Sequence, residues 1–511
     1  MPRYGRGGKT TLIASNPYFS CARTAPVGAR FQRARLHNWI DFYREPGALE
    51  TRPYRASRFI AKSPLQLVST CSLMGPGGME AFIESLGECQ FLSPLRHRQV
   101  GTDKFKTERQ RVLLDDSLEG VTGAIQRSES PLSFELAGPR EKIYFDPSKT
   151  TAAIVTCGGL CPGQNNIIRG IVTTLYSRYG VTRICGIRYG YEGLVPRHGH
   201  APLALRPESV SAIHNFGGTF LGSSRGPQSA AEIVDHLEEL GVNILFVIGG
   251  DGTLRGGAAI NSEIRQRNLK KSVIGVPKTI DNDIMYLDKS FGFETAFAEA
   301  VKAVSCAHIE AVGAMNGIGL VKLMGRDSGF IASSAALAAQ HVNFCLIPEV
   351  PFSLEGPRGL LEMVRHRIAR RKHALIVVAE GAGQELMQTN GGETDASGNR
   401  RLGDIGLFLK DKINDFFAER RMKISLKYID PSYTIRSVPA SPQDNFYCSR
   451  LAQNAVHAGM GGRTNMLIGR WHGSFVHIPF ELVIKGRRKV DPDGDLWQAV
   501  LESTGQPAWM R

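Results

Sequence analysis

Short apolar runs alternate with longer amphipathic segments from about residue 150 to the C-terminus. The runs are rich in β-branched residues and too short for helices, which predicts buried parallel strands. The segments between them have helical spacing. We expect strands at 152–155, 181–187, 243–246, 272–274, 318–323, 343–347, 374–378, 423–429, 465–468 and 475–483. We expect helices at 78–86, 166–179, 211–216, 230–240, 254–264, 295–311, 328–339, 360–370, 407–420 and 451–460.

Strands that alternate with helices predict an α/β fold with parallel sheets built from βαβ units. About 360 residues of this pattern exceed one sheet. We therefore expect two doubly wound, Rossmann-like lobes, with ligands in the cleft between them at the carboxyl ends of the strands. These lobes form a core at 151–485, preceded by a basic extension at 1–78 and an N-terminal arm at 79–150. A C-terminal tail follows at 486–511.

The sequence Gly249-Gly250-Asp251-Gly252-Thr253 joins one predicted strand to the helix after it. Glycines let backbone N–H groups approach phosphate oxygens, and a helix N-terminus favours negative charge. Asp251 could hold Mg²⁺ against those phosphates. A tight turn that packs a helix on a sheet is the alternative. A second sequence, Pro277-Lys278-Thr279-Ile280-Asp281-Asn282-Asp283, places two acids and an amide in a stiff loop and indicates a catalytic corner.

These two motifs together resemble the 6-phosphofructokinase family. Further similar motifs follow the family's order, from about residue 150 to the C-terminus. They are Cys157-Gly158-Gly159-Leu160-Cys161-Pro162-Gly163, Gly217-Gly218-Thr219-Phe220-Leu221-Gly222-Ser223-Ser224-Arg225-Gly226, Met324-Gly325-Arg326-Asp327-Ser328-Gly329-Phe330, Ala379-Glu380-Gly381 and Tyr433-Thr434-Ile435-Arg436. The resemblance implies two lobes and the transfer of a phosphoryl group from ATP to fructose 6-phosphate, giving fructose 1,6-bisphosphate.

The resemblance also implies a role for each matching residue. Asp281 is the catalytic base that accepts the proton of the sugar's 1-hydroxyl, and Asp251 binds Mg²⁺. Phosphoryl transfer depends on such a base and on charge neutralisation. The sugar phosphate is bound by Thr279, Ile280, Asp281, Met324, Gly325, Arg326, Glu380, Lys427, Tyr433 and Arg436. The nucleotide is bound by Gly159, Arg225, Gly226, Gly250, Asp251, Gly252 and Thr253.

The phosphoryl donor depends on two positions. Pyrophosphate-using relatives have Asp where this chain has Gly252, so the glycine indicates room for ATP. Lys278, by contrast, matches the pyrophosphate enzymes. The pair is similar to the ATP-dependent enzymes of plants and trypanosomatids. A pyrophosphate-dependent enzyme and a catalytically silent regulatory subunit are the alternatives. NAD and lipid kinases share the glycine motif only.

The N-terminal segment differs in composition from the rest of the chain. Residues 1–78 hold twelve Lys and Arg and three acids, which accounts for +9 of the chain's net charge of +14. This Arg-rich, hydroxyl-bearing, acid-poor segment is typical of a transit peptide, which predicts a plastid location. A disordered extension of a cytoplasmic enzyme, or upstream sequence included by a wrong start codon, are the alternatives.

Other compositional features indicate an ordinary globular enzyme. The charge is typical of a protein that binds phosphorylated substrates and gives no support to nucleic-acid binding. No apolar run approaches the ~20 residues that span a bilayer, so we expect no membrane partner. The nine cysteines are scattered, and we expect Cys157 and Cys161 to be small buried residues. The family resemblance further implies allosteric control and a homo-oligomer, either a dimer or a homotetramer.

Overall fold

The computed structural model describes residues 82–98, 105–387 and 401–510. These residues belong to the compact unit Leu73–Arg511, while the unit Met1–Ser72 lies outside them. The basic extension predicted at 1–78 is therefore outside the described residues. No helix in the described part of the chain is long and apolar enough to cross a membrane.

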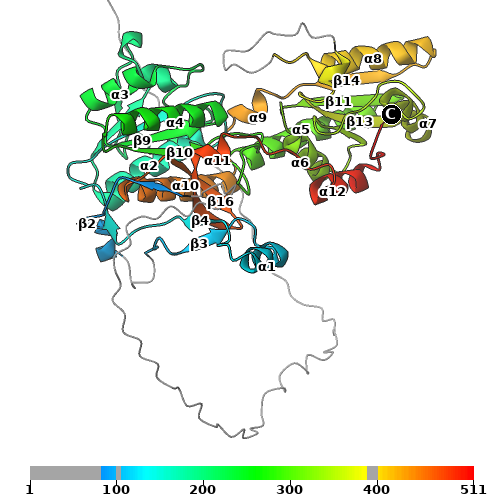
Figure 1. Ribbon diagram of the computed structural model, residues 1–511. Coiled ribbons are helices and arrows are strands. Elements are labelled where there is room, and N and C mark those ends of the chain that lie inside the picture. The colour runs from blue at the N-terminus through cyan, green and yellow to red at the C-terminus, as the bar shows by residue number, and fades with distance from the viewer. Residues whose placement is uncertain (1–81, 99–104, 388–400, 511) are drawn as a thin grey trace, which may run out of the picture. The chain divides into compact units, whose positions relative to one another are not determined.

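The first lobe is built on a nine-stranded sheet (Figure 1). Its order is β3-β4-β17-β16-β10-β9-β6-β7-β8, and the five strands from β16 to β7 are parallel. Every residue of β6, β9 and β10 is buried, as expected for strands covered on both faces. The bounds are β3 Arg111–Leu113, β4 Ser133–Leu136, β6 Thr151–Thr156, β7 Arg183–Ile187, β8 Leu203–Ala204, β9 Ile244–Gly249, β10 Ser272–Pro277, β16 Met466–Trp471 and β17 Ser474–Pro479.

Alternate residues of these strands enter two separate cores. Ile154 and Phe246 pack with helices α2 (Gln164–Thr173) and α10 (Pro442–Met460) on one face. Their neighbours Val155 and Val247 pack with α3 (Ala230–Glu239) and α4 (Asp251–Gln266) on the other. The helix α11 (Phe480–Val483) contacts α4. This two-sided covering is the predicted doubly wound arrangement.

The second lobe contains a four-stranded, wholly parallel sheet in the order β12-β13-β11-β14. Helices α5 and α6 cover one face, and α7 and α8 cover the other. The first of these cores is continuous with the α10 side of the first lobe. The bounds are α5 Phe293–Val312, β11 Gly317–Leu323, α6 Phe330–Ala339, β12 Phe344–Leu346, α7 Leu360–Arg371, β13 His373–Ala379, α8 Ile405–Glu419 and β14 Ser425–Ile429.

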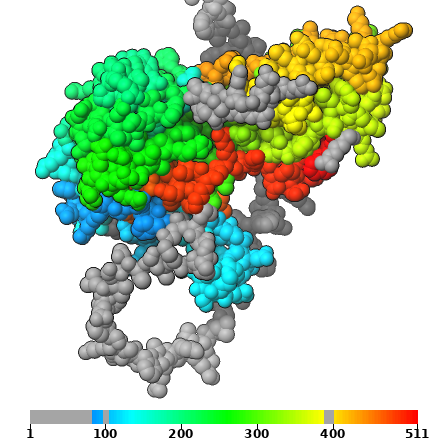
Figure 2. Space-filling view, turned by 45° about the horizontal axis from the view of Figure 1, so that its top comes forward, coloured from blue at the N-terminus to red at the C-terminus, as the bar shows by residue number. Residues whose placement is uncertain are grey.

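The chain passes between the lobes repeatedly. It enters the second lobe after β10, returns through the short helix α9 (Thr434–Ser437) and α10, and leaves again after α11. Its last helix, α12 (Asp495–Thr504), contacts α6 in the second lobe. Beyond it, the Gln506 side chain makes two hydrogen bonds with the backbone of Cys345. In Figure 2 the red C-terminal segment continues from the green first lobe to the yellow second lobe.

Four sequence predictions need correction. The described part of the helix expected at 78–86 is extended, with strand β1 (Glu84–Ser85) paired to β15 (Arg463–Thr464). The helix expected at 211–216 is one 3₁₀ turn, Ile213–Asn215. The helix expected at 166–179 ends in a π turn, Thr174–Tyr179. The strand expected at 475–483 stops at Pro479, and α11 follows. In the first segment, pairing with the distant strand β15 overrides a weak helix propensity. In the second, the chain forms a loop connection in which a weak helix propensity yields only one turn.

The segment before the first lobe adds short edge elements. Helix α1 (Leu118–Gln126) lies between β3 and β4, and β4 pairs with β17 at the edge of the large sheet. Strands β2 (Phe91–Leu92) and β5 (Lys142–Ile143) pair with each other. The domain boundaries at 79–150, 151–485 and 486–511 stay predictions.

Candidate active site

One cavity of about 920 Å³ collects most of the predicted site residues from both lobes. The residues predicted to bind the nucleotide come from the loops after β6 and β9 and from the loop before α3. Those predicted to bind the sugar phosphate come from the loop after β10 in the first lobe, from the second lobe and from the α9 segment. Gly325 and Lys427 are not among the lining residues. Those lining it are Gly159, Arg225, Gly226, Gly250, Asp251, Gly252, Thr253, Thr279, Ile280, Asp281, Met324, Arg326, Glu380, Tyr433 and Arg436.

The turn after β9 requires a glycine at position 249. A Cβ on Gly249 would lie 2.1 Å from the Thr253 hydroxyl oxygen, so the strand can pass closely under the first turn of α4. The Tyr191 hydroxyl donates to the carbonyl of Thr253 and supports this turn at 2.7 Å. A Cβ on Gly252 would meet no atom within 4 Å. The N-terminus of α4 therefore faces open cavity at Gly252, which suits the binding of phosphate.

Two further glycine loops are tied together beside this turn. The Gly158 N–H donates to the Ser224 carbonyl at 3.0 Å, and the Ser223 hydroxyl donates to the Gly158 carbonyl at 2.6 Å. The buried ammonium of Lys278 donates to the Gly159 carbonyl at 2.7 Å. Burial lowers the pKa of Lys278. These contacts fix Gly159, Arg225 and Lys278 around one part of the cavity.

The cysteines of the first loop are buried and free. Burial raises the pKa of Cys157 to about 12 and also raises the pKa of Cys161. A thiol with a raised pKa is a poor nucleophile. The prediction that both are small buried residues is confirmed.

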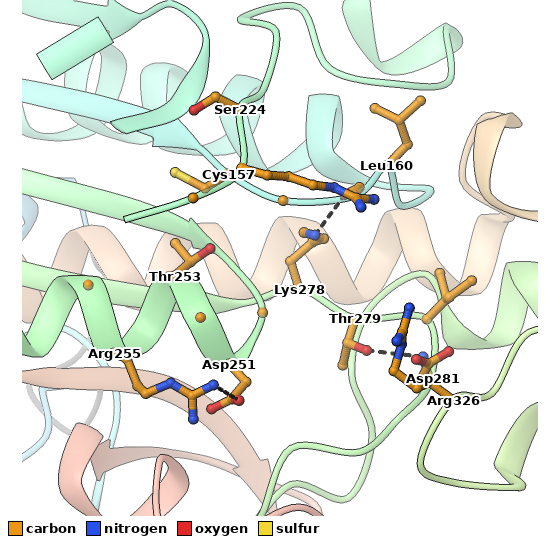
Figure 3. A pocket seen from close by; sticks show the side chains of 18 of the residues that line it. Cys157, Leu160, Ser224, Asp251, Thr253, Arg255, Lys278, Thr279, Asp281 and Arg326 are labelled. Atoms are coloured by element: carbon orange, nitrogen blue, oxygen red, sulfur yellow. Dashed lines mark hydrogen bonds and ion pairs between the residues drawn. The ribbon is translucent and has the colours of Figure 1, made fainter. Parts of the chain in front are cut away.

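Asp251 is the first residue of α4 and pairs with Arg255 one turn later (Figure 3). Among the described residues, no three or more His, Cys, Asp or Glu side chains are grouped to hold a metal ion. Mg²⁺ commonly uses one or two protein carboxylates together with substrate phosphates and waters. The Asp251 carboxylate, which lines the cavity at the N-terminus of α4, fits that mode of binding. Asp251 would hold the ion, which would neutralise phosphate charge.

Asp281 lies on the loop after β10, and Figure 3 shows it beside Thr279. The Thr279 hydroxyl accepts from the Asp281 N–H at 3.1 Å and donates to the Asp283 carboxylate at 3.0 Å. The Ser328 hydroxyl, from the second lobe, donates to the Asp281 carbonyl at 3.1 Å. One carboxylate oxygen of Asp281 is buried with no hydrogen-bond partner among the described residues. That oxygen is available to accept a substrate hydroxyl.

Burial raises the pKa of Asp281 well above its usual range, and the nearby charges of Asp283 and Glu380 raise it further. Such a carboxyl binds a proton more readily than an exposed aspartate. Groups with perturbed pKa values in a cleft are candidates for acid–base work. The environment of Asp281 therefore suits a general base.

Two of the residues predicted to bind the sugar phosphate, Arg326 and Glu380, depend on close backbone packing in the second lobe. A Cβ on Gly381 would lie 1.8 Å from the Arg326 carbonyl, so the segments that carry Glu380 and Arg326 approach directly. Burial raises the pKa of Glu380, against the opposing charge of Arg326. The guanidinium of Arg436 lies 4.9 Å from the ring centre of Tyr433, which is 76% exposed. Lys427 is exposed on the edge strand β14.

Sequence reasoning missed several lining residues, including Arg255, Lys322, Asp430 and Arg487. Lys322 binds Asp404 at 2.9 Å and Asp430 at 2.8 Å, partners far away in the sequence. Its only sequence signal is a charge inside an apolar strand. Arg487 contacts Asp251, Asp283 and Asp327, and its only signal is the basic run Lys485-Gly486-Arg487-Arg488-Lys489.

The sequence of both lobes matches a known protein family. The phosphofructokinase family model matches residues 151–459, and the chain belongs to that family. An ATP-dependent 6-phosphofructokinase from Borreliella burgdorferi is 50% identical over 437 residues, covering 84% of this chain and 97% of that protein. ATP-dependent 6-phosphofructokinase 5, chloroplastic, from Arabidopsis thaliana is 49% identical over a match that covers 73% of this chain and 68% of that protein. The Trypanosoma cruzi ATP-dependent 6-phosphofructokinase is 43% identical over a match that covers 83% of this chain and 87% of that protein.

A more distant solved structure shares the fold. The pyrophosphate-dependent phosphofructokinase from Marinobacter aquaeolei is 18% identical, with a TM-score of 0.57, covering 70% of this chain and 91% of that chain. The predicted family and the predicted α/β fold of two Rossmann-like lobes are confirmed.

Proposed function

We propose that this protein is an ATP-dependent 6-phosphofructokinase that converts D-fructose 6-phosphate to D-fructose 1,6-bisphosphate. One observation carries the proposal. A single cavity joins a glycine-lined helix N-terminus to the buried, raised-pKa carboxyl of Asp281. The relatives named ATP-dependent 6-phosphofructokinase support the same activity at up to 50% identity.

Each side of the cavity has its own task in this reaction. Gly250, Gly252 and Thr253 would receive the donor phosphates at the start of α4. Arg326 and Arg436 would bind the sugar phosphate, since a guanidinium fork matches phosphate oxygens. Glu380 would accept sugar hydroxyls. Gly159, Arg225 and Gly226 extend the donor side, while Thr279, Ile280, Met324 and Tyr433 extend the acceptor side.

The chemical step needs a base and charge neutralisation. The free carboxylate oxygen of Asp281 would accept the proton of the sugar's 1-hydroxyl as its oxygen attacks the terminal phosphorus of ATP. The bond to ADP then breaks, and ADP leaves. The Thr279 hydroxyl would hydrogen-bond the transferring group. Mg²⁺ bound at Asp251 would supply positive charge to the phosphates.

ATP is the proposed donor because of Gly252. The open space beyond its Cα leaves room for the nucleotide. Pyrophosphate is a second candidate donor because the Lys278 ammonium already reaches the glycine loop at Gly159. A silent regulatory subunit is disfavoured because Asp251, Asp281 and Arg326 meet in one cavity.

The donor assay tests the proposal directly. Purified protein is supplied with fructose 6-phosphate, Mg²⁺, and either ATP or pyrophosphate as sole donor. We expect fructose 1,6-bisphosphate with ATP and little product with pyrophosphate. Turnover with pyrophosphate alone would reverse the choice of donor, and binding of sugar phosphate without turnover would favour the regulatory subunit.

Three wider features belong to the same proposal. The protein would act as a homo-oligomer, either a dimer or a homotetramer, under allosteric control. It would work in the cytoplasm or in a plastid, with residues 1–78 as a transit peptide in the second case. Lys427 and Gly325 would bind substrate at the edge of the cavity.

A further inference from the structure

The segment after α11 is held tightly between the lobes. The Arg488 N–H donates to the Asp283 carbonyl at 2.7 Å, and its guanidinium donates to the carbonyls of Leu287 and Asp288 at 3.0 and 3.1 Å. The same guanidinium lies 4.9 Å from the ring centre of Phe330 on α6. Arg488 therefore anchors residues 485–490, which we call the C-terminal strap.

A second anchor lies two residues further on. The Val490 N–H donates to the Glu349 carboxylate at 2.8 Å, and the same oxygen accepts from the Gly329 N–H at 3.0 Å. Gly329 precedes α6 in the second lobe. With Arg488 and Val490 fixed, the Cα of Arg487 has a defined position beside the cavity, and its side chain lines that cavity.

The Arg487 guanidinium touches carboxylates from three motifs. It lies 3.6 Å from Asp251 on the nucleotide side and 3.7 Å from Asp283, two residues after the base. It also hydrogen-bonds Asp327, which follows Arg326 on the sugar side. Arg487 therefore lies between Asp251, the residue proposed to hold Mg²⁺, and the loop that carries the proposed base Asp281.

Arg487 is half-buried in the cavity wall, and its guanidinium keeps its positive charge over the working pH range. A permanent, half-buried cation with a planar donor fork is the group best suited to equatorial phosphoryl oxygens.

We propose that Arg487 is a catalytic residue that binds the transferring phosphoryl group between Asp251 and Asp283. This inference rests on the proposed phosphofructokinase activity. Arg487 makes and breaks no covalent bond. It donates hydrogen bonds to the oxygens of the transferring group while the sugar oxygen bonds to phosphorus, the ADP oxygen leaves, and Asp281 takes the proton. The strap delivers this group from a part of the chain remote from the other motifs.

Three variants test the role. Arg487→Gln removes the charge and the fork, and Arg487→Lys keeps the charge without the fork. Lys485→Gln is the matched control, because it removes one positive charge from the same strap at an exposed position outside the cavity lining. For each protein we would measure kcat and KM with ATP, and the melting temperature. Calorimetry would give the affinity for ADP alone, and for ADP with aluminium fluoride and fructose 6-phosphate as a mimic of the transferring group.

The expected pattern is specific to the transition state. Arg487→Gln should lower kcat about 100-fold, the scale for losing one preorganised donor. Its affinity for ADP should stay within about threefold, while affinity for the aluminium fluoride complex falls about as much as kcat. The kcat of Arg487→Lys should lie between those of Arg487→Gln and the wild type, and this variant provides the test if Arg487→Gln fails to fold. Lys485→Gln should have the kcat and both affinities of the wild type.

Three results would overturn the proposal. The first is kcat within about threefold of wild type in Arg487→Gln, or in Arg487→Lys if only that variant folds. The second is an equal loss of affinity for ADP and for the aluminium fluoride complex. The third is a lower melting temperature with kcat of the folded protein unchanged, as expected for a strap that only joins the lobes. No turnover in either wild type or Lys485→Gln would instead refute the phosphofructokinase activity itself.

Discussion

At the scale of single residues, Asp281 combines burial with an unsatisfied carboxylate oxygen. Replacing Asp281 with Asn keeps the shape of the side chain and removes the proposed base. We predict that Asp281→Asn lowers kcat by several orders of magnitude and leaves the affinity for fructose 6-phosphate within a few-fold, because only the transition state loses an interaction. Steady-state kinetics and equilibrium binding of the sugar phosphate check both parts. A fall in kcat of less than about tenfold would rule out the general-base role.

Gly252 governs the second prediction at this scale. Because a Cβ there meets nothing within 4 Å, Gly252→Asp should fold normally and direct a carboxylate into the donor side of the cavity. Repulsion of the nucleotide phosphates should then cost several kcal/mol, roughly the penalty for a close like-charge contact. We predict a large loss of ATP-dependent turnover and a measurable gain with pyrophosphate, which can still reach Lys278. Calorimetry that showed unchanged ATP affinity would mean that the nucleotide does not bind at this turn.

Single residues were predictable where a motif is contiguous. Gly252 and Asp281 follow directly from short sequences at the ends of strands, and the structure brings them into one cavity. Arg487 and Lys322 were not predictable. Their partners are distant in the sequence. Arg487 reaches Asp251 only where the two lobes pack, and the fold of the second lobe brings Lys322 to Asp404.

At the scale of elements, the edge of the large sheet contains a buried charge cluster. Glu135 on β4 faces His477 on the paired strand β17, at 3.2 Å, and also accepts hydrogen bonds from Arg140 and Arg463. Burial alone would raise the pKa of Glu135. The contacts with His477 and the two arginines outweigh burial and lower this pKa to about 2.

This lowered pKa predicts how stability depends on pH. A carboxyl whose pKa falls on folding from 4.5 to about 2 stabilises the protein above pH 4.5 by about 3 kcal/mol, and the contribution is lost as the pH falls towards 2. Glu135→Gln should therefore be less stable at pH 7 by about that amount. Denaturant unfolding of both proteins at pH 7, 5 and 4 checks this, since the difference should narrow only below pH 4.5. A difference in unfolding free energy that does not change with pH would contradict the proposal that the ionised Glu135 carboxylate stabilises the fold.

The parallel strands of the two sheets, together with β17, were predictable because they are short apolar runs. The strand β8 and the strands of the N-terminal segment, including β3 and β4 of the large sheet, were not. β1 and β2 each hold two residues and exist only because a distant strand pairs with them, so no local periodicity marks them. The helix expected at 211–216 is longer than the observed 3₁₀ turn at Ile213–Asn215 for a related reason. Six residues contain too little periodicity to determine the length of a helix.

At the scale of the whole molecule, the basic N-terminal extension offers the last prediction. If residues 1–78 form a transit peptide, a protein that begins at Met79 should keep wild-type kcat and KM, because the described site draws all its lining residues from Cys157 onward. A fluorescent protein that carries residues 1–78 should enter a plastid. A diffuse cytosolic signal would favour a disordered extension, and loss of activity on deletion would show that the segment contributes to the enzyme.

The order of strands in the large sheet has a consequence for synthesis on the ribosome. The parallel strand β16 lies between β10 and β17, yet it is translated after all four strands of the second lobe's sheet. The first lobe therefore cannot complete its sheet while the nascent chain is still short of residue 466, and β10 has an open edge until then. An exposed strand edge is a site for pairing with other chains. The growing polypeptide thus carries an aggregation-prone edge through the translation of almost 190 residues, from Pro277 to Met466, and shielding by a chaperone would matter most in that interval.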